Sequence, residues 1–230
     1  MLFLARCYWP RDLQPRRSNA EENMSFEKWY GDWTAVFLIT AVFLFFLFFL
    51  TRPRKPKEWR GAGLTSAFFI SLFTEMFGIP LTIYVLAPVL GVKPKSFGMY
   101  ESHLWAYLLS RTGIISLKGS VSIVMILSTG LLILGFILLA NGWKKVYRGG
   151  SKLVTDGLYA RVRHPQYLGL IVIVIAFLIM WPTILTVLLA PFLIAGYVLL
   201  AREEDRDLEE KFGDDFKHYR DTVPAFVPSM

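Results

Sequence analysis

The sequence predicts an all-α, polytopic membrane protein with about five transmembrane helices and a helical hairpin near its carboxy terminus. Of the 230 residues, 54% are hydrophobic and 16% are aromatic, a composition typical of membrane proteins. Long apolar runs recur with few charges inside them. The 25 Lys and Arg residues gather in short segments between these runs, as they do in loops that face an anionic membrane surface.

The amino-terminal tail covers residues 1–32. Its opening apolar stretch, MLFLA, is too short for a signal peptide, and arginines and prolines follow it. Met24 opens MSFEKWYGDW, where we expect translation to begin. Residues 1–23 would then be either an artefact of start-site assignment or a disordered tail.

Five apolar runs are the expected membrane spans, with the first three inside an amino-terminal transmembrane region at 33–140. The runs cover residues 33–50, 64–90, 121–140, 167–180 and 183–201. Trp181-Pro182 separates the last two runs, and proline disfavours a continuous helix there. We therefore expect a helical hairpin, with one long kinked helix as the alternative.

The distribution of basic residues predicts the orientation. Three dense segments carry five, six and five Lys or Arg residues: 52–60, 141–167 and the tail after Ala201. With five crossings these segments share one face, which the positive-inside rule places in the cytoplasm. The carboxy terminus is then cytoplasmic and the amino terminus lies outside, at the inner membrane in a bacterium.

The formal net charge of +7 would suggest nucleic-acid binding in a soluble protein, but here it indicates contact with membrane lipids. We expect no nucleic-acid partner. The single cysteine, Cys7, excludes an intramolecular disulfide, and the three histidines lack metal-site spacing. No metal is therefore expected.

The stretch RVRHPQYLGL at 161–170 places polar chemistry at the start of a span. Pro165 suits a first helical turn, so Arg163 and His164 flank a helix amino terminus that attracts anions. Tyr167 follows His164 by three residues and shares its face. Gly169 has no side chain, so another group can approach the backbone closely.

Glu203 and Glu204 leave the second limb of the hairpin on the side where Arg163 enters. An anion-binding helix start would then face a carboxylate pair, and a zwitterion would satisfy both. S-adenosylmethionine fits this description, because its amino-acid end carries a carboxylate and an ammonium and its sulfonium favours aromatic faces. The alternative is that these charged residues are interfacial anchors.

The joint pattern RHPQYLG, hairpin and EEDRDLEEKFGDDFKHYRDTVPAFVP resembles the isoprenylcysteine carboxyl methyltransferase and phospholipid methyltransferase group of integral-membrane enzymes. The resemblance covers roughly residues 153–228. It implies that a cytoplasmic carboxy-terminal segment, 141–230, binds S-adenosylmethionine and transfers its methyl group.

The resemblance also implies roles for individual residues. His164 and Tyr167 look like ligands of the methionyl end, which Arg163 supports. The loop that contacts adenine and ribose corresponds to Lys152, Leu153, Val154, Gly157 and Tyr159. Glu203 and Glu204 look like partners of the cofactor's polar groups, and Arg202 and Glu204 are the candidate catalytic residues. Counted back from Phe212-Gly213, however, the family's glutamate pair falls on Glu204 and Asp205, so the individual acidic assignments stay open.

The expected substrate is a lipophilic acceptor: an isoprenylcysteine-type carboxylate, a phospholipid amine or a small thiol. Glu75 lies in the middle of a span, where it either makes a structural hydrogen bond, to a neighbouring helix or to backbone freed by Pro80, or lines a substrate tunnel. His103 and Trp105 are expected at the substrate entrance.

Two rival functions remain. Sterol-type membrane reductases that use NADPH carry a similar HPxY stretch, but here Leu170 follows Gly169 and the acidic tail favours a methyltransferase. The second rival function is that of a non-enzymatic scaffold or transporter. A transporter fits poorly, because the five expected spans show no repeats.

Overall fold

The computed structural model describes residues 30–51, 56–89, 103–149 and 152–227. Every regular element in this part is helical, which confirms the predicted class. The expected start at Met24 lies outside the described residues. The elements are α2 (Trp33–Thr51), α3 (Pro56–Phe73), η2 (Thr74–Gly78), α4 (Leu81–Val89), α5 (Leu104–Ser110), α6 (Leu117–Gly149), η4 (Gly157–Ala160), α7 (Pro165–Met180), α8 (Ile184–Phe212) and α9 (Asp214–Thr222).

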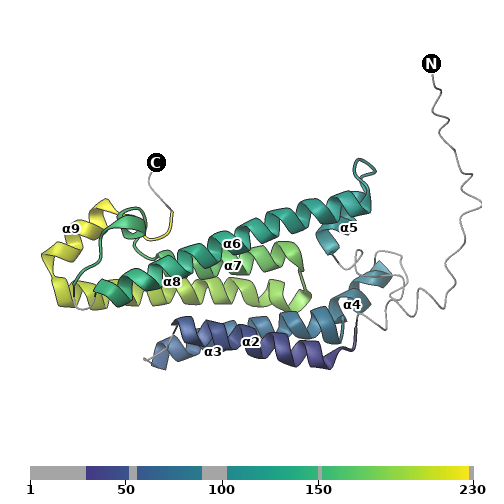
Figure 1. Cartoon of the computed structure of the whole chain (residues 1–230), viewed down its shortest axis with the longest axis horizontal. Helices are drawn as coiled ribbons and strands as arrows, with labels where there is room; N and C mark the ends of the chain where they lie inside the picture. The colour runs from purple at the N-terminus through teal and green to yellow at the C-terminus, as the bar shows by residue number, and fades with distance from the viewer. Residues whose placement is uncertain (1–29, 52–55, 90–102, 150–151, 228–230) are drawn as a thin grey trace, which may run out of the picture.

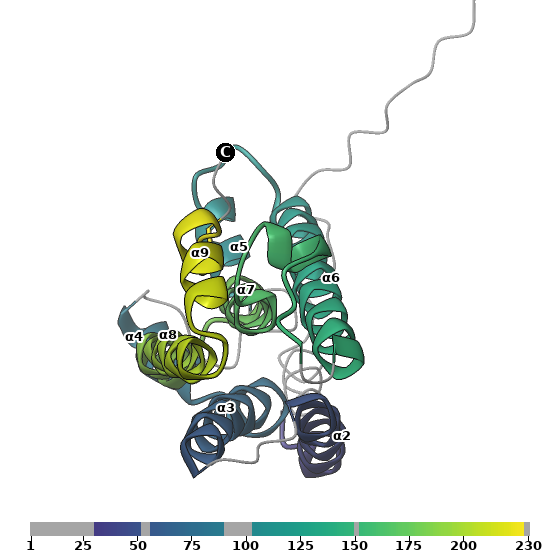
Figure 2. The ribbon, with the colours of Figure 1, turned by 90° about the vertical axis from the view of Figure 1, so that its left-hand side faces the viewer.

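The long helices run side by side along one direction (Figure 1). Viewed end-on, α7 lies between α6 and α8, with α2 and α3 forming a second layer (Figure 2). The seam between the layers is aromatic: Phe43 of α2 meets Phe69 of α3 at 4.1 Å between ring centroids, and Phe177 of α7 packs edge-on against both. Many outward-facing apolar side chains are exposed, as expected of helices surrounded by lipid.

The predicted count of five spans is only partly supported. Within the described residues, α6 and α8 are each long and apolar enough to cross a membrane. A third span results if Gly61–Gly78 and Leu81–Val89, which meet at a 68° bend, act together. The apolar helices α2 and α7 are shorter; the 16 residues of α7 reach about 24 Å, less than a hydrocarbon core of about 30 Å. The boundary expected at residue 140 falls inside the continuous helix α6.

The bend between α3 and α4 explains the buried Glu75. A π-helical turn, η2, precedes Pro80, which has no N–H and cannot continue the ladder. Glu75 Oε2 accepts the backbone N–H of Thr82 at 2.8 Å, so the carboxylate satisfies the start of α4. Thr82 Oγ1 in turn accepts the N–H of Ile184 at 2.8 Å, which ties the bend to the start of α8. Of the alternatives for Glu75, the structural hydrogen bond to backbone beside Pro80 is present.

Helices α6 and α7 pack backbone against backbone. A Cβ atom built on Gly169 would lie 2.7 Å from the carbonyl oxygen of Gly135, and one on Gly135 would lie 2.9 Å from that of Gly169. Small residues allow this separation between membrane helices. The group that approaches Gly169 closely is therefore α6.

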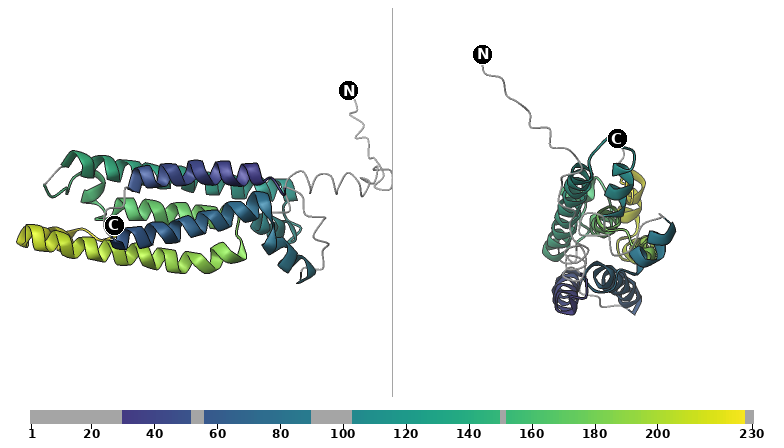
Figure 3. Two further views of the ribbon diagram at one scale, coloured as in Figure 1. Left: turned by 90° about the horizontal axis from the view of Figure 1, so that it is seen from below. Right: turned by 90° about the vertical axis from the view of Figure 1, so that its right-hand side faces the viewer.

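The helix directions bring the start of α7, the end of α8, η4 and α9 to one end of the bundle, seen on the left of Figure 1 and from below in Figure 3. Helices α4 and α5 lie at the opposite end. The fold therefore assembles its polar carboxy-terminal elements at a single end.

Candidate active site

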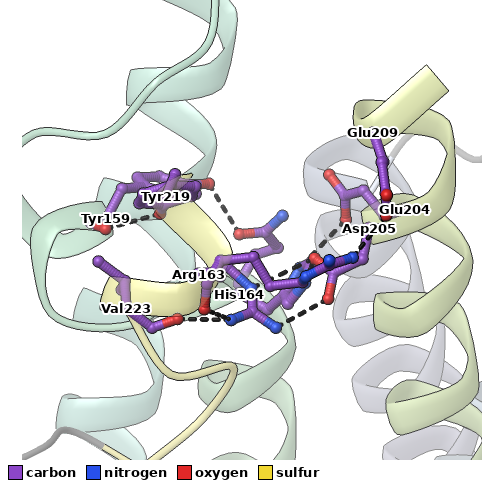
Figure 4. Close-up of polar contacts among 10 residues, drawn as sticks. Tyr159, Arg163, His164, Glu204, Asp205, Glu209, Tyr219 and Val223 are labelled. Carbon is purple, nitrogen blue, oxygen red and sulfur yellow. Dashed lines mark hydrogen bonds and ion pairs between the residues drawn. The ribbon is translucent and has the colours of Figure 1, made fainter. Parts of the chain in front are cut away.

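Four side chains predicted from two distant segments meet at this end of the bundle (Figure 4). Arg163 and His164 precede α7, while Glu204 and Asp205 lie on α8 beyond its apolar part. Arg163 Nη2 lies 2.9 Å from Asp205 Oδ2, and His164 Nε2 lies 2.8 Å from Asp205 Oδ1. His164 Nδ1 lies 3.5 Å from Glu204 Oε2. A helix start and a carboxylate pair therefore face each other.

His164 is almost completely buried, with 1% of its surface exposed. Burial lowers the pKa of the imidazole, but its contacts with Asp205 and Glu204 outweigh burial, so the pKa is raised above its usual value. Nδ1 is buried and has no hydrogen-bond partner among the described residues. At 3.5 Å, Glu204 is close enough for ionic attraction but does not make a well-formed hydrogen bond. Nδ1 therefore retains bonding capacity for another molecule.

Arg163 is occupied by the protein itself. Its guanidinium donates to both carboxylate oxygens of Asp205 and to the carbonyl oxygens of Arg220 and Val223. The backbone N–H groups of Arg163 and His164 donate to the carbonyl oxygens of Pro224 and Ala225. Residues 220–225 are thus hydrogen-bonded to the residues that precede α7. Arg163 therefore has a structural role, since it connects this tail to Asp205.

The loop expected to hold adenine and ribose packs between α6, α7 and α9. Tyr159 is buried; its hydroxyl donates to Gln166 Oε1 at 2.8 Å, and burial raises its pKa. The Tyr219 hydroxyl donates to the Tyr159 carbonyl at 2.6 Å. Gly157 has φ +65°, which favours glycine, and its Cα faces Lys145.

The other loop residues differ in exposure. Lys152 is exposed, Val154 is half-buried, and Leu153 packs against the cluster of Phe216, Tyr219 and Val223.

Tyr167 links the polar site to an apolar cavity. Its ring centroid lies 5.8 Å from that of His164 and 6.4 Å from that of Tyr197, on which it stacks. Tyr197 lines a cavity of about 350 Å³, and its hydroxyl bonds Thr65 Oγ1 at 2.7 Å. The remaining cavity walls are apolar: Leu38, Ile39, Val42, Phe43, Phe46, Phe69, Phe136, Leu139, Leu170 and Ile173.

Three residues expected near the substrate lie at the other end of α7. His103 Nδ1 donates to the Met180 carbonyl and Trp105 Nε1 to the Leu178 carbonyl, each at 2.9 Å. These bonds satisfy the last turn of α7, about 24 Å from its start. Glu75 lies at the bend already described. None of the three joins the cluster around His164, and their roles toward a substrate stay predictions.

On α8, Arg202 is exposed and Glu203 is half-buried, both directly beyond the buried Ala201. Asp205, which the sequence raised only as an alternative to Glu203, is the residue that binds both Arg163 and His164. The sequence signal for Asp205 was its spacing from Phe212-Gly213. For the contacts of Gln166 and of the tail carbonyls, the sequence offered no such signal. The described residues contain no group of three or more His, Cys, Asp or Glu that could hold a metal ion.

Two comparisons find known proteins that are similar to part of this chain. The chain is 34% identical to the protein-S-isoprenylcysteine O-methyltransferase of Schizosaccharomyces pombe over 77 residues, which are 33% of this chain and 33% of that protein. The match thus spans about a third of the relative's length. The phospholipid methyltransferase family matches residues 120–215, which contain His164, Glu204 and Asp205. The resemblance expected from RHPQYLG and the acidic helix is therefore confirmed: this part of the chain is phospholipid methyltransferase-like.

Proposed function

We propose that this chain is an integral-membrane methyltransferase that uses S-adenosylmethionine to methylate a lipophilic acceptor. The observation that carries the proposal is the position of the buried His164. Its Nδ1 lies beside Glu204 and has no hydrogen-bond partner in the part of the chain that the structure describes, and its ring is joined through Tyr167 and Tyr197 to an apolar cavity. The proposed polar site for the donor and the proposed apolar site for the acceptor would thus be neighbours. The family match supports the same reaction class.

The side chains of the polar site fit the proposed cofactor. S-adenosylmethionine would supply a methyl group on a sulfonium, ready for transfer to a nucleophile. Glu204, whose side chain is 35% exposed, can accept from an ammonium, while His164 Nδ1 can bond a carboxylate. The ring of Tyr167 offers an aromatic face to a sulfonium. Lys152, Leu153, Val154, Gly157 and Tyr159 are the proposed surroundings of the nucleoside.

The acceptor would lie in the cavity between the layers. Its walls include Leu38, Val42 and Phe46 of α2, which are exposed on the outer surface, so a lipid chain could enter sideways from the bilayer. The protein's main contribution would be to align acceptor and methyl group in a water-poor space. A carboxylate acceptor needs no base, whereas an amine must first lose a proton. Arg202 is the proposed contact for an anionic acceptor.

We infer the orientation from the basic segments. By the positive-inside rule, the clustered Lys and Arg residues of 141–167 and of the tail favour a cytoplasmic position for the polar end of the bundle. The amino terminus would lie on the outer side.

The test is isothermal titration of the purified protein in detergent with S-adenosylhomocysteine. We expect binding by the wild type and a loss of at least tenfold in His164→Ala, because the variant removes the buried group beside Glu204. His103→Ala is the matched control: it removes an equally buried histidine at the other end of α7 and should leave affinity unchanged. Binding of NADPH in place of S-adenosylhomocysteine would instead identify a reductase.

A further inference from the structure

Asp205 differs from Glu204 in what its carboxylate contacts. Both of its oxygens are used inside the protein, Oδ1 by His164 Nε2 and Arg163 Nε and Oδ2 by Arg163 Nη2. Its side chain is 15% exposed, against 35% for Glu204. Both oxygens of Asp205 therefore already accept hydrogen bonds from the protein, whereas the Glu204 side chain is more exposed. The two neighbouring acids cannot have the same role.

The Asp205 contact also decides which nitrogen of His164 is available. A carboxylate at 2.8 Å from Nε2 requires a proton on Nε2, because a carboxylate only accepts. The remaining nitrogen, Nδ1, is buried and unpartnered among the described residues and lies on the side of Glu204. A ring held in any other orientation would present a different atom there.

The His164 ring has neighbours from α7, α8 and the tail. Asp205 and Glu204 face it from α8, the Tyr167 ring from α7 at 5.8 Å and the Phe226 ring from the tail at 6.1 Å. Arg163 is the neighbouring cation, and it shares Asp205 with the ring. Two acids against one cation around a buried imidazole favour its protonated form, in agreement with the raised pKa of His164.

We propose that Asp205 is a positioning residue, which holds the His164 imidazolium through Nε2 so that its Nδ1–H and the Glu204 carboxylate together receive a zwitterionic amino-acid group. Nδ1–H donates to the ligand carboxylate, and Glu204 accepts from the ligand ammonium. This inference rests on the proposed function and adds to it the role of Asp205. Asp205 acts through His164 and does not touch the ligand.

The experiment compares Asp205→Asn with Asp205→Glu, and with Glu210→Gln as a control that removes one exposed carboxylate from the same helix. Affinity for S-adenosylhomocysteine is measured from pH 5.5 to 8.5, and the His164 titration is followed by ¹⁵N NMR. In the wild type, affinity should fall as the pH rises through the His164 midpoint. Asp205→Asn should move that midpoint down and weaken binding at neutral pH about tenfold or more. Asp205→Glu should restore part of the shift, and Glu210→Gln should change neither quantity.

Three results separate the possibilities. An unchanged midpoint in folded Asp205→Asn overturns the proposal, because a purely structural role would weaken binding without moving the titration. If Asp205→Asn does not fold, the wild type still decides: above its midpoint the proton of neutral His164 must remain on Nε2, and a proton on Nδ1 overturns the proposal. If the wild type shows the expected tautomer but binds no S-adenosylhomocysteine, the proposed function fails and not the geometry of the pair.

Discussion

The close contact between α6 and α7 gives a sharp test of the fold. A methyl group added at Gly169 would lie 2.7 Å from the carbonyl oxygen of Gly135, 2.8 Å from the backbone nitrogen of Leu139 and 3.2 Å from its Cα. All three are backbone atoms of α6, so no rotamer change can relieve the contact. An ordinary contact begins at 3.4 Å. The helices must therefore separate by about 0.7 Å, the difference between 3.4 and 2.7 Å.

We expect Gly169→Ala to lower the free energy of unfolding by about 1–3 kcal/mol, the range for overpacking in a dense interior. The gain in helix propensity, at most about 1 kcal/mol, offsets part of this loss. Separation of α6 from α7 also displaces the first turn of α7, beside which His164 lies. The affinity for S-adenosylhomocysteine should therefore fall along with stability.

The matched control is Gly130→Ala. Gly130 lies in the same helix as Gly135, but a Cβ there meets nothing within 4 Å. This variant should be neutral or up to about 1 kcal/mol more stable, because only the propensity term remains. Thermal unfolding in detergent, followed by circular dichroism, measures both variants. Equal stability of Gly169→Ala and Gly130→Ala would refute the backbone contact between the helices.

Three further predictions concern buried polar groups. The pKa of His164 is raised on folding, so protonated His164 stabilises the folded state fully below the unfolded pKa of about 6.5, and this contribution is lost as the pH rises through the folded pKa. The melting temperature should therefore decline above pH 6.5, and His164→Gln should flatten this decline. Glu75→Gln should retain the bond to the Thr82 N–H and cost little, whereas Glu75→Ala should lower unfolding free energy by about 1–3 kcal/mol with unchanged cofactor affinity per folded molecule; a selective loss of acceptor methylation in Glu75→Gln would instead favour a tunnel role. Tyr219→Phe should lower unfolding free energy by about 0.5–1.5 kcal/mol, since it removes the 2.6 Å bond to the Tyr159 carbonyl, and an unchanged melting temperature would contradict that bond.

The fold was predictable where one side-chain property decides the outcome. Apolar runs locate the long helices, and Trp181-Pro182 separates α7 from α8, because proline cannot donate to a continuing ladder. The number of spans was less predictable, because a sequence shows hydropathy but not the length at which a helix ends. The run 167–180 thus gave a helix shorter than a membrane core.

The site was predictable in its residue types and less so in its contacts. A buried charge needs a partner, which led from Glu75 to the backbone beside Pro80 and from Arg163 to the acids of α8. Which acid pairs with which base depends on the rotation of α8 about its axis, and one residue changes that by about 100°. The tail contacts were not visible at all, since the carbonyls of Pro224 and Ala225 have no side-chain signature.

The energetic balance of the cluster supports the proposed ligand site. The charges of Arg163 and Asp205 are paired with each other. Removing one partner of a buried ion pair costs about 3–5 kcal/mol. The same cluster leaves His164 Nδ1 buried and unpartnered among the described residues, a defect that costs about 1–3 kcal/mol. In a cluster that served stability alone, an apolar side chain in place of the histidine would remove this cost. In the proposed complex, an anionic group of the bound molecule would complete the missing hydrogen bond at His164, and its cationic group would pair with the partly exposed Glu204.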